Sequence, residues 1–82
     1  MDCAWFAALA GVWLAATVDT VSFAVMSDDP EMSIVWLTDV AYEGMDFADR
    51  LRGCGLDDKV IKIEVRARAM MTAAHRLEGK LR

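Results

Sequence analysis

Side chains able to do acid–base, nucleophilic or metal chemistry are sparse in this sequence of 82 residues. His75 is the only histidine, and Met71 and Arg76 lie near it where a catalytic triad would need an acid and a nucleophile. The sequence has no Cys-x-x-Cys or His-x-x-x-His pair and no glycine-rich phosphate loop. We therefore expect a protein that is not an enzyme and that uses no metal or cofactor.

Carboxylates form the most regular polar pattern in the chain. Four of them follow helical spacing on the side of a predicted helix opposite its apolar stripe: Asp39, Glu43, Asp46 and Asp49. Like charges at this spacing repel, at a cost of a few tenths of a kcal/mol per pair. A solvated face that keeps the protein soluble is the plain explanation. The functional explanation is an acidic surface that docks on a basic site of another protein.

Three aromatic residues of the same helix lie off its apolar stripe: Trp36, Tyr42 and Phe47. Trp and Tyr anchor protein interfaces more often than other residues do. We therefore add these three residues to the four carboxylates as one candidate protein-binding surface.

The N-terminal segment offers a second candidate surface. Residues 3–26 are apolar nearly all round, as is typical of a helix that is central in a bundle or shared with a neighbour. Within this segment, the candidate face for an oligomer or a partner helix contains Trp5, Phe6, Gly11 and Trp13. We expect one of the two tryptophans to be internal.

Acidic and basic residues are separated along the chain. Residues 1–49 carry nine carboxylates and no Lys or Arg, and residues 50–82 carry all nine basic residues and four carboxylates, so the net charge of −4 hides charges of −9 and +5. The acidic part argues against direct nucleic-acid binding, and no helix-turn-helix or zinc pattern accompanies the basic part. We expect Lys59, Lys62 and Arg66 to pair partly with carboxylates of the preceding helix.

Stop and start signals divide the chain into three predicted helices. Asp28 or Asp29 caps a helix that begins near Pro30, and Gly53 ends it after two arginines. We expect helices over about 3–26, 30–52 and 57–81, with residues 1–82 forming a single domain.

Apolar spacing predicts how these helices pack. The stripe of the second helix contains Ile34, Leu37, Ala41, Gly44, Ala48 and Leu51. The stripe of the third contains Val60, Ile63, Ala67, Met70, Ala74, Leu77 and Leu81. Two such stripes joined by a short glycine turn predict an antiparallel hairpin, and hence an all-α, antiparallel three-helix bundle.

A small α+β domain is the alternative fold. Residues 61–66 alternate strictly between apolar and charged side chains, and strands near 18–26, 32–38 and 60–67 could form a sheet. However, no Gly, Pro or Asn falls between Leu56 and Glu78 to turn such a strand into the helix that residues 69–77 still require. We therefore favour the bundle.

The chain has more apolar material than so small a domain easily covers. A monomer of this size buries only about 60–65% of the surface that its unfolded chain exposes, whereas 56% of its residues are hydrophobic. We expect some of this surface to meet another protein, lipid or a second copy of the chain, as in a homodimer.

Cys3 and Cys54 bear on the cellular compartment. The N-terminus lacks the basic region of a secretory signal, so a reducing cytoplasm with free thiols is the default expectation. In an up-down-up bundle, however, both cysteines lie at the same end, where a disulfide is geometrically conceivable.

A membrane role is disfavoured. The uncharged run Cys3–Val18 stops at Asp19, short of the roughly 20 residues that a spanning helix needs. The positive-inside rule would require Lys or Arg beside the cytoplasmic end of a spanning helix, and neither residue flanks this run. A small membrane-associated subunit anchored by this segment remains the alternative to a soluble protein.

These observations together predict a small acidic, cytoplasmic protein-binding module that acts as a regulator, inhibitor or adaptor of another protein with a basic surface. Size and acidity resemble those of inhibitors encoded by phages and mobile elements, and this comparison is an analogy only.

Overall fold

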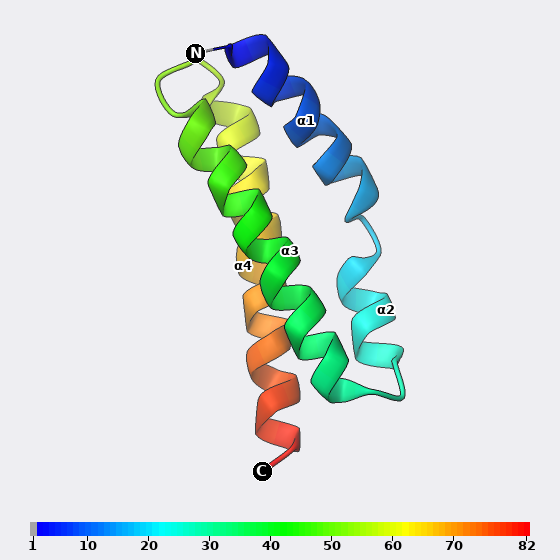
Figure 1. Ribbon diagram of the computed structural model, residues 1–82. Helices are drawn as coiled ribbons and strands as arrows, with labels where there is room; N and C mark the ends of the chain where they lie inside the picture. Colours follow the sequence, from blue (N-terminus) through cyan, green and yellow to red (C-terminus); the bar gives the residue numbers. More distant parts are fainter. Residues whose placement is uncertain (1) are drawn as a thin grey trace.

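The computed structural model describes residues 2–82, which fold into four helices. Their bounds are α1 Cys3–Ala16, α2 Thr20–Met26, α3 Pro30–Leu51 and α4 Asp57–Lys80. The two long helices α3 and α4 lie side by side and antiparallel, and α1 and α2 follow one another along one side of this hairpin (Figure 1). The resulting molecule is narrow, with dimensions of 42 × 18 × 17 Å.

Local interactions explain where α3 begins and ends. The carboxylate of Asp29 accepts the backbone N–H of Met32 at 3.1 Å, and Pro30 occupies the first helical position. Beyond α3, Gly53 and Gly55 have φ angles of 83° and 76°, in the left-handed region that glycine adopts without strain. The chain therefore reverses at the predicted place.

The prediction of one continuous helix over residues 3–26 is wrong, because the chain turns at residues 17–19. In a continuous helix the carbonyl of Leu14 would accept the N–H of Val18. Here a guanidinium N–H of Arg66, on α4, donates to that carbonyl at 2.9 Å. The hydroxyl of Thr17 donates to the carbonyl of Trp13 at 2.8 Å and helps to close this end of α1.

The predicted apolar stripes form the core of the α3–α4 hairpin, except that Ile34 is only partly buried and Leu81, beyond the end of α4, is 48% exposed. Its largest fully buried side chains are Leu37, Leu51, Ile63 and Met70. Trp13 joins this core from α1 and is only 4% exposed, whereas Trp5 is 59% exposed. The expectation that one of these two tryptophans is internal is confirmed.

The all-α, antiparallel three-helix-bundle architecture is confirmed, with its first helix divided in two. The α+β alternative is wrong: no strand occurs between residues 2 and 82, and the segments near 18–26, 32–38 and 60–67 are almost entirely helical. The alternation at 61–66 has no effect because Ile63 alone is buried, while Ile61 and Val65 lie exposed on α4. The longer helical stripe that contains Ile63 determines the structure.

A disulfide joins Cys3 to Cys54, with the two Cα atoms 6.0 Å apart. The expectation of free thiols is therefore wrong, because it rested on the compartment and took no account of where the bundle places these residues. The bond links the first residue of α1 to the turn between α3 and α4. The N-terminal end of α1 is thus held covalently to the hairpin.

Candidate functional site

Trp13 seats α1 on α3. Its indole N–H donates to the carbonyl of Val40 at 3.1 Å. The ring fills the space beside Gly44, where an added Cβ would lie 2.3 Å from a ring carbon. This close approach fixes the position of α1 and removes Trp13 from any exposed binding surface.

Two basic residues of α4 hold the other side of α1. Lys59 donates to the carbonyl of Ala7 at 3.2 Å, and Arg66 donates to the hydroxyl of Thr17 at 2.9 Å as well as to the backbone. The predicted pairing of Lys59, Lys62 and Arg66 with carboxylates of α3 is wrong, since no ion pair joins them to α3 in the described chain. Both cations donate to carbonyls of α1 instead, and that of Leu14 lies in the last turn, where helix carbonyls lack an intrahelical partner.

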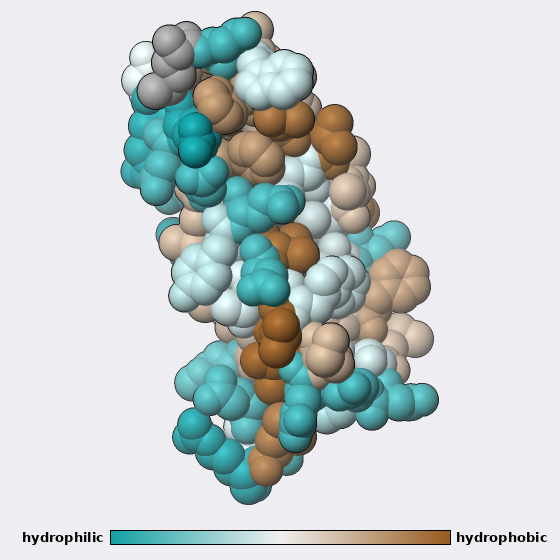
Figure 2. Space-filling view, in the orientation of Figure 1, coloured by the Kyte–Doolittle hydropathy of each residue, from teal (hydrophilic) through white to brown (hydrophobic). Residues whose placement is uncertain are grey.

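The side of α1 that faces away from the hairpin is apolar throughout. We call it the outer face of α1, and its exposed residues are Ala4, Trp5, Ala8, Val12, Ala15 and Ala16. In Figure 2, brown and tan surface covers this part of the molecule beside teal surface at the turn between α3 and α4. The outer face contains no charged or hydrogen-bonding side chain except the indole of Trp5.

The structure corrects the candidate face of the N-terminal segment, of which only Trp5 is exposed. Phe6 is half-buried, with the guanidinium of Arg50 4.8 Å from its ring centroid. Gly11 faces α4, where an added Cβ would lie 3.6 Å from the Lys59 ammonium. These residues bind α1 to its own hairpin, and a periodicity argument could not assign them to one side or the other.

By length and composition alone, the segment Cys3–Met26 could cross a membrane. Only 28% of its most apolar stretch is buried. The core helix of a soluble protein is mostly buried. Exposed apolar surface of this extent in residues 3–26 is typical of a region that another molecule covers.

A groove of about 390 Å³ lies between α1 and α3 and reaches Thr20 at the start of α2. We call it the α1–α3 groove. Three of the predicted site residues on α3 line it, Trp36, Glu43 and Phe47, together with Trp13 of α1. Val12 and Ala16 of α1 form part of the opposite wall. Glu43 is the only ionisable residue among those lining the groove.

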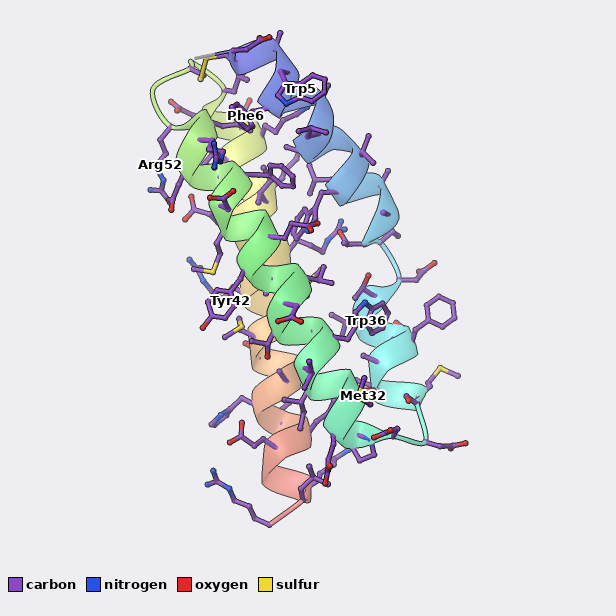
Figure 3. All side chains as sticks on the ribbon, viewed as in Figure 1. Trp5, Phe6, Met32, Trp36, Tyr42 and Arg52 are labelled. Carbon is purple, nitrogen blue, oxygen red and sulfur yellow. A yellow bond between two sulfur atoms is a disulfide. The ribbon has the colours of Figure 1, made fainter. Side chains whose placement is uncertain are left out.

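The other predicted site residues lie elsewhere on α3. In Figure 3, Tyr42 points away from α1 and α2, whereas Trp36 points toward α2. Tyr42 is 57% exposed, and Val35 and Met45 are exposed at helical spacing from it. We call this surface the outer face of α3, and its residues are Val35, Asp39, Tyr42, Met45, Asp46 and Asp49.

The carboxylates of the outer face of α3 differ in their partners. Asp46 accepts from Arg50 at 2.9 Å, and Asp49 is 3.2 Å from Arg52. Asp39 has no hydrogen bond or ion pair to any described residue. All of these side chains are exposed, so the pairs contribute little to stability and the carboxylates remain accessible.

His75 is exposed on α4. Within residues 2–82, no group of three His, Cys, Asp or Glu side chains has the arrangement of a metal site. The fold does gather carboxylates next to exposed apolar side chains, on the outer face of α3.

Comparisons with protein-family models, with curated proteins and with solved structures found no match to this chain. The class that fold and surface define is a small helical bundle with an acidic, partly apolar helix face.

Proposed function

We propose that this chain is a small protein-binding module, acting as a regulator, inhibitor or adaptor, which docks the outer face of α3 on a basic surface of another protein. The observation that carries the proposal is the exposure of Tyr42, Val35 and Met45 directly beside carboxylates. A face that served solubility alone would present charge without this apolar stripe.

The two components of the face have different tasks. Tyr42 is a large, rigid side chain with a polar tip, and burying it against a partner removes apolar surface from water. Asp39 and Asp46 attract basic side chains, steer the encounter and fix its orientation. Because the side chains of Asp46 and Arg50 are 61% and 47% exposed, a partner's cation can approach Asp46 at little cost.

We propose that the chain binds another protein rather than catalyses a reaction, and that it does so in the cytoplasm. The Cys3–Cys54 disulfide argues against this location, since disulfides persist in oxidising compartments and are rare in a reducing cytosol. Alkylation of thiols in intact cells tests it: blocked thiols at both cysteines support the cytoplasm, and an unmodified disulfide contradicts it.

Affinity capture from the host lysate, read by mass spectrometry, tests the proposed binding face. We expect Tyr42→Ala, and separately the pair Asp39→Ser and Asp46→Ser, to lose a protein that the parent chain recovers. Exposed charges are screened by salt, so recovery should also fall as ionic strength rises.

Matched controls keep this result specific. Phe23→Ala removes an aromatic residue that is 65% exposed on α2. The pair Asp19→Ser and Asp28→Ser removes two exposed carboxylates that do not belong to the outer face of α3. Both controls should recover the partner unchanged, with folding checked by circular dichroism. Equal recovery by all variants would remove the outer face of α3 from the proposal.

A second candidate function is a small membrane-associated subunit anchored by residues 3–26. The observation that favours it is the low burial of this apolar segment. Against it stand the disulfide and the Trp13 and Arg66 contacts, all of which an inserted segment would have to give up or reorganise. Solubility without detergent separates the two functions.

A further inference from the structure

The outer face of α1 is a stretch of apolar residues on which no other described residue packs. Trp5 and Val12 are 59% and 67% exposed, and Ala8, Ala15 and Ala16 of the same face are exposed as well. Soluble monomers seldom leave a contiguous surface of this kind uncovered.

Grooves of opposite charge flank this face. On one side lies the α1–α3 groove, whose only ionisable residue is Glu43. On the other side, a groove of about 510 Å³ between α1 and α4 is lined by Lys62 and Arg66 together with Ile61 and Val65. Because Arg66 already donates to α1, Lys62 is the cation left to meet an outside group.

Both charges lie level with the same turn of α1. Glu43 shares its groove with Val12 and Ala16, and Lys62 shares the opposite groove with Leu14 and Ala15. A helix turn rises by about 5.4 Å, so the two side chains lie at similar heights on either side of α1.

These positions determine how two copies can meet. A two-fold axis parallel to α1 keeps every residue at its height and exchanges the two sides, so acid faces base across the interface. A two-fold axis perpendicular to α1 and lying in the interface would place acid against acid and base against base. Charge complementarity thus selects the parallel arrangement.

We propose that a second copy of this chain covers the outer face of α1 in a parallel two-fold dimer, with Glu43 of each protomer facing the partner's Lys62. This dimer leaves the outer face of α3 free, so it is independent of the proposed function. A 14-residue helix is about 21 Å long, and so short an interface predicts a weak dimer with a micromolar Kd.

Sedimentation equilibrium of the parent chain and of charge variants tests the proposal. Glu43→Lys alone and Lys62→Glu alone each create two like-charge contacts and should weaken the dimer by about tenfold or more. An equimolar mixture of the two variants should restore it as a heterodimer, because both contacts are then attractive. Val12→Lys should abolish it.

Controls account for the change in net charge. Glu31→Lys and Lys80→Glu make the same charge changes at exposed positions that line neither groove, and both should leave the dimer intact. A parent chain that stays monomeric up to millimolar concentration would overturn the proposal. So would single variants that dimerise as the parent does, or a mixture that fails to recover.

A second experiment distinguishes a second copy of the chain from lipid as the partner of the outer face of α1. Flotation with neutral phosphatidylcholine vesicles is measured on the parent and on the charge variants. Vesicle binding by a chain that is monomeric in solution would assign the outer face of α1 to membrane and refute the dimer. Dimerisation without flotation supports it.

Discussion

At the scale of single residues, the contact between Trp13 and Gly44 makes a sharp prediction. Gly44→Ala places a methyl group against the Trp13 ring, whose nearest carbon lies 2.3 Å from the added Cβ. The ring is buried and its N–H is bonded to Val40, so it cannot move away freely. We expect a loss of about 1–3 kcal/mol in the free energy of unfolding, as for other overpacked cores. Urea denaturation measures it.

Gly79→Ala is the matched control. Gly79 is helical and exposed, and an added Cβ meets nothing within 4 Å. Since alanine favours helix over glycine by up to about 1 kcal/mol, this change should stabilise the protein. In the background of Trp13→Ala, the cost of Gly44→Ala should nearly vanish. A cost that is the same in both backgrounds would show that the contact is not its cause.

Arg66 makes a second prediction at this scale. Arg66→Met keeps an unbranched apolar stem but removes the guanidinium, and with it the bonds to Leu14 O and to the Thr17 hydroxyl. Bonds from charged donors contribute about 1.5–3 kcal/mol each when buried, and Arg66 is half-buried, so we expect a loss of about 1–2 kcal/mol by thermal denaturation. Arg68→Met, at an exposed position with no such bonds, should change stability by less than about 0.5 kcal/mol.

Buried core residues could be predicted from the sequence, whereas the contacts of Gly44 and Arg66 could not. The buried stripe that includes Leu37 and Ile63 follows from spacing alone, because helical periodicity decides which side meets the core. Two other contacts depend on how helices distant in the sequence pack against each other. Gly44 makes room for the Trp13 ring, and Arg66 donates to α1 rather than to a carboxylate. No local pattern contains that information.

At the scale of elements, α1 has two kinds of attachment. One end is joined by the Cys3–Cys54 disulfide, and the body is held by Trp13, Lys59 and Arg66. The α3–α4 hairpin supplies the four largest fully buried side chains of the core, and none of them comes from α1. α1 is therefore the element that reduction should loosen first.

Reduction of the disulfide, or Cys3→Ser, should destabilise the protein. The cysteines are 51 residues apart, and closing a loop of that length removes enough unfolded-state entropy to contribute about 2–4 kcal/mol. For a domain of this size, this corresponds to a fall in Tm of more than about 10 °C. Hydrogen exchange should speed up in residues 3–16 before it does in α3 and α4. An unchanged Tm after reductant would contradict the prediction.

Element boundaries were predicted well where the signal was local and poorly where it was not. The start of α3 at Pro30 and the turn at Gly53 depend on capping and on φ, which the sequence states directly. The break at residues 17–19 contains no Gly or Pro, and it arises because α4 supplies a donor to the carbonyl of Leu14. The predicted binding surface on α3 was also only partly right, because local spacing does not tell which residues α1 approaches. Trp36, Glu43 and Phe47 line the α1–α3 groove, whereas Tyr42 and the other carboxylates face solvent.

At the scale of the whole molecule, the separation of charge along the chain is weaker in space than in sequence. Lys59 and Arg66 bind carbonyls of α1, and three other basic residues pair with carboxylates: Arg50, Arg52 and Arg82. Four basic side chains of α4 remain without such partners among the described residues: Lys62, Arg68, Arg76 and Lys80. They do not form the continuous patch that contacts a run of phosphates.

We therefore expect the protein not to bind nucleic acid. Fluorescence anisotropy of a labelled duplex at about 0.1 M salt should show no saturable binding, because so few phosphates can be neutralised at once and the net charge of −4 repels the rest. Glu78→Lys adds positive charge between Arg76 and Lys80. This variant tests whether the assay detects a small gain in affinity for the duplex. Saturable binding by the parent chain that falls steeply with salt would mean that the basic side of α4, and not the acidic face of α3, is the surface through which this protein meets its partner.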